Sequence, residues 1–305
     1  MIFIKTITRL SVLCLTCCYV IAFLLQECQH DAMIYFQNRS SFYSEITGSK
    51  CFKHNKPFYL AQLLIRPRSC GEYCVIRGDT VAKVLYDILT HKKHVRKITF
   101  PEGISAYEIN KKITSCEYLS GDFITVKDGE VFPDTYHYNR GAKRQTIVDM
   151  MKKQMSAVMN GIHNKTNLSK DEIIILASII SRESGSKDEM PNISSVFHNR
   201  LRKNMRLQSD VTVIYMASNH TNVVGELTRK DFGIDDPYNT YKKYGLPPGP
   251  ICCPGRDAIL AACNPAKTDY LYFIADINNR VCYFSKTFDE HLKIKNRLDR
   301  GLEVG

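Results

Sequence analysis

The stretch NLSKDEIIILASIISRESG, residues 167–185, constrains the fold of this chain more than any other. Ser169 and Glu172 have the spacing of a capping box, in which each side chain bonds the free backbone N–H of the other residue at a helix N-terminus. An unbroken apolar run follows, and the Ser-Gly pair at 184–185 indicates where the helix stops. The sequence therefore predicts a buried helix that ends close to Glu183.

Glu183 is the candidate acid of this helix. It lies three and four residues after Ile180 and Ile179, so it shares their apolar stripe. Loss of water and the negative end of the helix dipole both disfavour a carboxylate, so we expect its pKa to rise. A carboxyl group with a raised pKa can act as a general acid. In the alternative interpretation, Glu183 points into solvent or pairs with Arg182 or Arg200.

The N-terminus has the charge pattern of a membrane anchor. Lys5 and Arg9 precede an uncharged, apolar run from Leu10 to Leu25. Because basic residues favour the cytoplasmic side, we expect residues 1–9 to be a cytoplasmic tail, residues 10–26 a transmembrane anchor, and the remainder to lie outside. A cleaved signal peptide is the alternative, but no pair of small residues with the spacing of a cleavage site follows the run.

The charge of the chain is basic but diffuse. There are 42 lysine and arginine residues against 31 aspartate and glutamate residues, a net charge of +11, without a long run of like charge. A diffuse excess suits an anionic membrane surface or an acidic polymer, whereas a protein that reads nucleic acid usually concentrates its charge on one element. We therefore expect no nucleic-acid partner. A solvated, lysine-rich surface explains the excess equally well.

The cysteines give no metal site and no unique disulfide pattern. Three of the twelve lie in the apolar run, which leaves nine, an odd number, so at least one thiol stays unpaired in a monomer. Cys70 and Cys74 could bridge locally, but the connectivity cannot be read from spacing. The sequence has no pair of CxxC motifs, no glycine-rich phosphate loop and no GxSxG elbow. We expect neither a metal nor a cofactor.

The sequence patterns in the rest of the chain predict an α+β protein. Residues 27–95 predict a small module with a strand pair and one or two helices, and residues 96–160 a connecting segment that begins the next domain. In residues 161–305 we expect a helix around 193–201, and a strand at 211–215 from the alternation of Val211, Val213 and Tyr215. A proline-, glycine- and tyrosine-rich loop, a short helix, two strands and a helix follow; such a loop can present aromatic faces to sugar rings.

Several ordered motifs carry a resemblance to a known family. They are KITFPEGISAYEI, DGEVFPDTYHY, LASIISRESG, SVFHNRLRKNMRLQSDVTVIY, YNTYKKYGLPPGPICCPG and DYLYFIAD with FSKTFDEH. In this order and spacing they resemble the endolytic lytic transglycosylases of the MltG (YceG-like) family. The resemblance covers nearly everything after the predicted anchor.

The resemblance implies a single-pass protein of the bacterial inner membrane, with a cytoplasmic N-terminus, a small LysM-like module and a periplasmic catalytic domain. Its substrate would be the glycan strands of nascent peptidoglycan, cleaved between N-acetylmuramic acid and N-acetylglucosamine to leave a 1,6-anhydromuramyl end. Peptidoglycan synthases would be its partners.

Carried over position by position, the resemblance places the catalytic glutamate on Glu183. It implies substrate-binding or orienting roles for the residues that match the motifs around the cleft: Gln208, Asp210, Thr212, Tyr215, Asn239, Tyr241 and the loop Leu246–Pro250. The chain departs from the family pattern at four positions, where it has Ser181, Val211, Cys253 and Cys282. These departures leave the acid in place but alter the wall of the cleft.

Three functions are compatible with the sequence. The first is the lytic transglycosylase. The second is a hydrolytic muramidase in which Asp210 acts as a second carboxylate, since ordinary glycosidases use two. The third is a non-catalytic, membrane-tethered protein that binds the wall.

Overall fold

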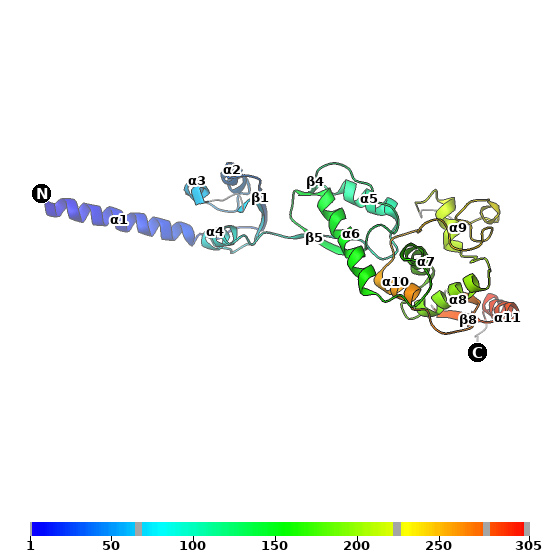
Figure 1. Ribbon diagram of the computed structural model, residues 1–305. Helices are drawn as coiled ribbons and strands as arrows, with labels where there is room; N and C mark the ends of the chain where they lie inside the picture. Colours follow the sequence, from blue (N-terminus) through cyan, green and yellow to red (C-terminus); the bar gives the residue numbers. More distant parts are fainter. Residues whose placement is uncertain (1, 65–68, 222–226, 277–280, 302–305) are drawn as a thin grey trace. The chain divides into compact units, whose positions relative to one another are not determined.

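The computed structural model describes residues 2–64, 69–221, 227–276 and 281–301, without the side chains of residues 2–11 and 64. It is a mixed α+β structure, as predicted (Figure 1). The chain divides into two compact units: an N-terminal unit of residues 1–97 with 137–142, and a C-terminal unit of residues 98–136 with 143–305. The chain therefore returns to the first unit once before it completes the second.

The N-terminal unit combines a two-stranded sheet with short helices. Its elements are α1 (Ile2–Leu24), β1 (Ala32–Phe36), α2 (Ser41–Gly48), α3 (Phe58–Ala61), η1 (Gln62–Leu64), β2 (Gly71–Val75) and α4 (Val81–Leu89). Strands β1 and β2 pair antiparallel, with Ile34 opposite Tyr73. The predicted strand pair is confirmed.

An aromatic cluster forms the core of this unit. Ile34 and Phe36 alternate with partly exposed residues along β1, so one face of the strand is buried. The Phe36 ring stacks on Tyr73 at 5.7 Å between centroids and meets the edge of Phe42 at 5.2 Å. Helix α4 closes the core, and the Thr80 hydroxyl caps it by accepting from the N–H of Lys83.

Helix α1 exposes large apolar side chains over the part whose side chains are described. Val12, Leu13, Leu15 and Ile21 are each more than half exposed. Its end packs on the N-terminal unit, where Phe23 meets the edge of Phe58 at 5.1 Å. Within the described residues, no helix combines the length and the apolarity needed to cross a bilayer. The transmembrane anchor at residues 10–26 stays a prediction.

The C-terminal unit is mainly helical. Its elements are α5 (Ala106–Ser115), β4 (Leu119–Ser120), β6 (Ala142–Lys143), α6 (Arg144–Gly161), α7 (Lys170–Glu183), α8 (Met190–Arg202), α9 (Asp210–Ala217), η3 (Asp231–Gly233), α10 (Arg256–Cys263), β7 (Tyr272–Asp276), β8 (Val281–Ser285) and α11 (Phe288–Asp299). Strands β3 (Arg96–Thr99) and β5 (Thr135–Tyr138) pair where the chain passes between the units. The helix and the two strands predicted after the proline-rich loop, and the helix that closes the domain, are all present.

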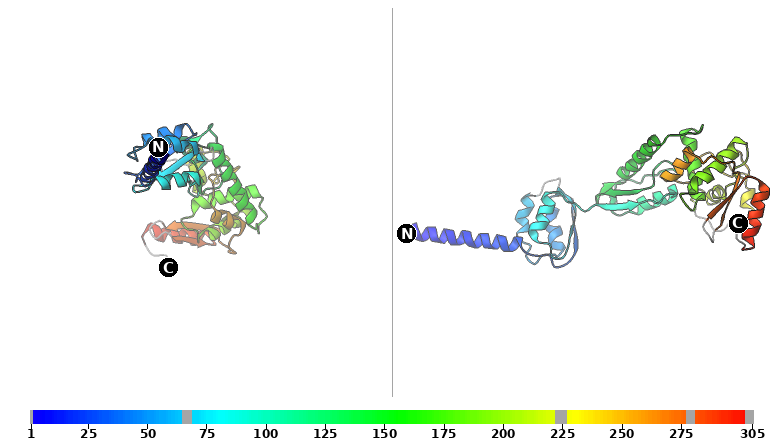
Figure 2. Two further views of the ribbon diagram at one scale, coloured as in Figure 1. Left: turned by 90° about the vertical axis from the view of Figure 1, so that its left-hand side faces the viewer. Right: turned by 90° about the horizontal axis from the view of Figure 1, so that it is seen from below.

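Helix α7 is the central element of this unit. Ser169 and Glu172 form the predicted capping box, which fixes the first turn. The helix packs against α8, α9 and α10 (Figures 1 and 2). Leu176, Ile179 and Ile180 are fully buried in the apolar cluster of this unit. The predicted buried helix is confirmed, and it ends at Glu183.

The predicted strand at 211–215 is wrong, because these residues form helix α9. Val211, Val213 and Tyr215 are buried, but so is Thr212 between them, so the alternation does not mark one face of a sheet. A short apolar run cannot be assigned to strand or helix from periodicity alone. The acidic Asp210 in the first turn complements the helix dipole and favours the helix start at this point.

A buried ion pair stabilises the N-terminal unit. The carboxylate of Glu72, on β2, is 1% exposed, and Arg96 donates to both of its oxygens at 2.6 and 2.8 Å. Arg140 adds a third bond at 3.2 Å. Burial alone would raise the pKa of Glu72, but the two arginines outweigh it and hold the pKa below its usual value. Arg140 belongs to the returning segment 137–142, so this carboxylate holds that segment to the unit.

Replacing Glu72 by Gln should destabilise the N-terminal unit by about 3 kcal/mol at neutral pH, because two arginines lose their buried counter-ion. Hydrogen exchange of the β1 and β2 amides reports on this unit alone. Because the folded pKa is lowered, the stabilisation by Glu72 should persist above about pH 4.3 and disappear as the pH falls through the folded pKa. Asp87→Asn, in the same unit, is the control: its ion pairs with Lys83 and Lys92 are partly exposed, and their loss should cost less than about 1 kcal/mol. Equal, small losses in both variants would contradict this account.

Candidate active site

Glu183 is the last residue of α7 and the centre of the site. Its side chain is half-buried, and the hydroxyl of Ser209 donates to Oε1 at 2.5 Å. Ser209 is the residue that precedes α9, so two helix ends meet at this carboxyl group. Within the described part of the chain, Glu183 forms no ion pair and no hydrogen bond through Oε2. One oxygen is therefore held and the other is available.

The surroundings of Glu183 keep its carboxyl group partly protonated at neutral pH. Burial raises its pKa to about 7. The hydrogen bond from Ser209 acts in the opposite direction, the negative charge of Asp210 raises the pKa further, and the positive charge of Arg200 lowers it. The predicted rise is present, and desolvation is its main cause.

Arg200 does not pair with Glu183, which excludes that part of the alternative interpretation. Its Nε donates to the carbonyl of Leu271 at 2.6 Å, and its Nη1 donates to the carbonyl of Leu207 at 2.7 Å. The guanidinium also lies over the ring of Tyr272, 5.2 Å from the centroid. Through these contacts Arg200 joins α8 to the segments before α9 and β7.

Ser209 is held in place by a small polar interior. It is 2% exposed, and its N–H donates to the hydroxyl of Thr240 at 3.0 Å. The hydroxyl of Thr212 donates to the carbonyl of Ser209 at 2.7 Å and lies 2.9 Å from that of Thr240. Thr212 is fully buried, so the geometry gives it a supporting position behind the site.

Asp210 and Tyr241 form a second polar pair beside Glu183. The Tyr241 hydroxyl donates to Oδ1 of Asp210 at 2.5 Å, and burial together with this carboxylate raises the pKa of Tyr241. Asp210 is exposed, as is Gln208, whose N–H donates to the carbonyl of Thr240 at 3.1 Å. Gln208 has a φ of +48°, a left-handed backbone that turns the chain sharply ahead of Ser209. The structure thus brings Gln208, Asp210 and Tyr241 together around Glu183.

Tyr215 and Asn239 lie in the interior. The Tyr215 hydroxyl donates to Oδ2 of Asp128 at 2.9 Å. The Asn239 amide donates to the carbonyls of Phe232 and Ile234, at 3.2 and 2.7 Å, and is fully buried. Both side chains are therefore engaged in holding loops of the C-terminal unit.

The loop Leu246–Pro250 is fixed against α7. The N–H of Ile251, directly after the loop, donates to the Ser178 hydroxyl at 3.0 Å, inside the core. On the other side, Gly129 has a φ of +72°, and a Cβ added there would lie 2.5 Å from Pro250 and 2.7 Å from Ile174. Only glycine fits between the start of α7 and the proline, so the loop is rigid at this point.

Two of the departures from the family pattern, Ser181 and Cys282, have defined neighbours in the structure. Ser181 lies beside Gly103, where a Cβ on the glycine would be 3.3 Å from its hydroxyl. The N–H of Cys282 donates to Oε1 of Glu189 at 2.7 Å. Burial, the Glu189 carboxylate and the charge of Glu183 raise the pKa of the Cys282 thiol to about 12, so this thiol stays protonated.

A cavity of about 880 Å³ lies elsewhere in the unit. None of the predicted site residues contributes to it. It is lined by residues 165–168 and 264–269 and by Ser195, His198, Asn199, Leu201 and Arg202. The chemistry of the predicted residues and the size of this cavity therefore indicate different positions for the functional site. We place the site at Glu183, because a partly desolvated acid with one free oxygen is a more specific signal than volume.

Sequence reasoning missed Ser209, Thr240 and Asp128. Ser209 lies between Gln208 and Asp210, two predicted site residues, so its position in the sequence was the signal that could have identified it. Burial raises the pKa of Asp128, which accepts from the N–H of Ala106 at 2.7 Å and from Tyr215. Its position in KDGEVFP gave no indication of that contact.

Comparison with known proteins gives consistent results. A family profile described as the YceG-like family matches residues 37–297. A protein of Bacillus subtilis named endolytic murein transglycosylase is 41% identical over 174 residues, which are 56% of this chain and 47% of that protein. A protein of the same name from Streptococcus pneumoniae is 34% identical over 170 residues, 54% of this chain and 31% of that protein. The chain thus spans about half of the first relative and about a third of the second.

A solved structure shares the fold. The crystal structure of a yceG-like protein from Listeria monocytogenes is 25% identical in sequence and superposes with a TM-score of 0.56. The match covers 87% of this chain and 99% of that one.

Two substitutions should move the pKa of Glu183 in opposite directions. Ser209→Ala removes the hydrogen bond that stabilises the carboxylate, so the pKa should rise above that of the wild type. Asp210→Asn removes a nearby negative charge, so the pKa should fall. Titration of the glutamate side-chain carboxyl carbons by NMR, with Glu183→Gln used to assign the resonance, measures both shifts. A shift of the same sign in both variants would show that the two neighbours do not act as described.

Proposed function

The chain belongs to the YceG-like family, and we propose that it is an endolytic murein transglycosylase. The proposed reaction cleaves the β-1,4 bond between N-acetylmuramic acid and N-acetylglucosamine in nascent peptidoglycan. The names of the relatives from B. subtilis and S. pneumoniae support this reaction. The observation that carries the proposal to this chain is the Glu183 carboxyl group, whose pKa of about 7 suits a proton donor at neutral pH.

In the first proposed step, Glu183 protonates the glycosidic oxygen. The Ser209 hydroxyl holds Oε1, so Oε2 is the atom that presents the proton to the substrate. As the bond between C1 of the muramyl residue and this oxygen breaks, positive charge develops on the sugar ring. The proposed role of Asp210, whose side chain is exposed and whose charge acts on Glu183, is to stabilise that positive charge.

In the second proposed step, Glu183 acts as a base. The 6-hydroxyl of the same muramyl residue attacks C1, and the Glu183 carboxylate takes the proton from this hydroxyl. A C1–O6 bond forms, the glutamate regains its proton, and the product is a 1,6-anhydromuramyl end. The attack is intramolecular, which gives it the entropic advantage of proximity, and it requires one carboxyl group rather than two.

A hydrolytic muramidase is the second candidate, and the proximity of Asp210 favours it. The charge of Asp210 acts on the pKa of Glu183, so two carboxyl groups share the site, as in ordinary glycosidases. The hydrogen bond from Tyr241 supports the first candidate, because it occupies one oxygen of Asp210 and weakens it as a base or nucleophile. Hydrolysis would leave a reducing end, so the product distinguishes the two reactions.

We further propose that the protein is a single-pass protein of the bacterial inner membrane, with residues 10–26 as the anchor and the catalytic unit in the periplasm. The exposed apolar side chains of α1, the basic residues before them and the net charge of +11 support this topology. Residues 27–95 would form a LysM-like module that binds glycan strands, and peptidoglycan synthases would be partners. Co-purification of a synthase with the tagged full-length chain tests the last point.

Glu183→Gln should lower the rate of glycan cleavage by at least about 10²-fold, because the amide can neither donate nor accept the required proton. Mass spectrometry of fragments released from purified glycan strands should show 1,6-anhydromuramyl ends with the wild type and almost none with the variant. The wild-type rate should fall as the pH rises above about 7, where the proton is lost. Reducing ends would support the muramidase. Unchanged cleavage by Glu183→Gln would refute both enzymatic proposals.

The same variant reports whether the fold survives. The folded pKa of Glu183 is raised, so the wild type should lose stability as the pH rises from about 4.3 to about 7, and the Gln variant should not. Thermal unfolding at pH 5 and pH 8 should therefore show a relative gain for the variant at pH 8. If the variant were unfolded, its loss of activity would not test the role of Glu183 as the acid. Asp149→Asn, an exposed change on α6, is the matched surface control.

A further inference from the structure

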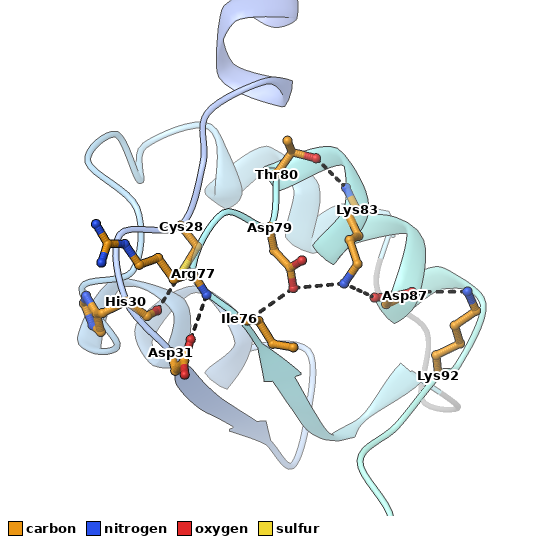
Figure 3. Close-up of polar contacts among 10 residues, drawn as sticks. All are labelled: Cys28, His30, Asp31, Ile76, Arg77, Asp79, Thr80, Lys83, Asp87 and Lys92. Atoms are coloured by element: carbon orange, nitrogen blue, oxygen red, sulfur yellow. Dashed lines mark hydrogen bonds and ion pairs between the residues drawn. The ribbon is translucent and has the colours of Figure 1, made fainter.

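The segment that follows α1 is bonded into the N-terminal unit beside the turn before α4. The N–H of Cys28 donates to the carbonyl of Asp79 at 2.8 Å, and its carbonyl accepts from the N–H of Gly78 at 3.0 Å. Figure 3 shows Cys28 next to this turn, where Asp79 also accepts from the N–H of Ile76 and from Lys83. The backbone of Cys28 is thus held at one position.

A second segment approaches Cys28 from the loop after α2. The N–H of Gln29 donates to the carbonyl of Cys51 at 2.9 Å, and Nε2 of His30 lies 3.0 Å from the carbonyl of Ser49. These contacts place the backbones of residues 28–30 and 49–51 side by side. Only backbones this close can be joined by a disulfide without distortion.

The side chains of Cys28 and Cys51 meet inside the core. Cys28 is 2% exposed and Cys51 is 0% exposed, and both belong to the apolar cluster of this unit. The Cys28 thiol donates to the carbonyl of His30 at 2.9 Å and the Cys51 thiol to that of Ser49 at 3.8 Å, and the Cys51 thiol is near enough to raise the pKa of Cys28. Two neighbouring buried thiols, on chain segments joined by the backbone bond from Gln29 to Cys51, are the arrangement from which a disulfide forms.

We propose that Cys28 and Cys51 form a disulfide that ties the exit of α1 to the core of the N-terminal unit. The bond would close a loop that contains β1 and α2. Residues 26–28 connect α1 to the unit, so the bond would keep α1 attached to a folded unit when force or detergent acts on the helix. A compartment outside the cytoplasm, where the proposed topology puts these residues, is one in which such bonds persist.

The proposed reaction is thiol–disulfide exchange with a low-molecular-weight disulfide such as oxidised glutathione. The thiolate of one cysteine attacks a sulfur of the reagent and releases one molecule of reduced thiol. The thiolate of the second cysteine then attacks the mixed disulfide, releases the second molecule of reduced thiol and leaves the intramolecular bond. Burial raises the pKa of Cys28 to about 11, so exchange in the folded unit is slow, and the bond should form as the unit folds.

The test uses the full-length chain, refolded from denaturant in a buffer of oxidised and reduced glutathione and then treated with an alkylating reagent. Cleavage after Glu27 separates Cys28 from the three cysteines of α1, and trypsin releases residues 28–39 and 51–53, each with a single cysteine. Mass spectrometry without reduction should find these two peptides joined. The result does not depend on the proposed catalytic activity, because no substrate is present.

A second measurement keeps the proposal testable if a variant fails to fold. In the wild type, hydrogen exchange of residues 28–51 should be about 100-fold slower in the oxidised than in the reduced protein. Cys28→Ala and Cys51→Ala should each abolish this difference, whereas Cys263→Ala, a buried cysteine of the C-terminal unit, should retain it. Recovery of both wild-type peptides in alkylated form from folded protein, or of either joined to another cysteine, would overturn the proposal.

Discussion

The removal of water from one carboxyl group, Glu183, is the constraint on which the site depends. The capping box at Ser169 and Glu172 sets where α7 begins, and the burial of Leu176, Ile179 and Ile180 sets how it is rotated. Together they leave the final residue half-buried, with its pKa raised to about 7. A shift of one residue in the helix would turn Glu183 away from the partners that surround it, so the chemistry follows from the packing of the core.

Each polar group around Glu183 is held by defined hydrogen bonds. Ser209 holds one oxygen of the acid, and Thr240 and Thr212 hold Ser209 from inside. Arg200 donates its hydrogen bonds to backbone carbonyls. Its positive charge therefore lies near Glu183 without forming an ion pair with it. Such a site is organised before substrate binds, and preorganised polar groups are an efficient means of stabilising charge that develops during a reaction.

Local signals in the sequence predicted much of this structure. The capping box that starts α7 is predicted from spacing alone, and the structure shows the same motif at α5 and α11. The alternation of Val211, Val213 and Tyr215 predicts a strand, but the segment forms α9, because its surroundings and not its periodicity decide between the two. The role of Ser209 could not be read from the sequence, since it depends on a contact with a residue 26 positions away. For the same reason, Thr212 and Asn239 matched a binding motif, yet the structure shows that their side chains are engaged inside the protein.

The most direct test of the central claim is the pKa of Glu183 in the unsubstituted protein. The side-chain carboxyl carbon can be followed by NMR from pH 3 to pH 9 in the folded chain without substrate. A midpoint near 7 is the result that desolvation at the end of α7 predicts. A midpoint near 4.3, the value of a glutamate in water, would contradict it, because the group would then be a solvated carboxylate with no proton to donate at neutral pH.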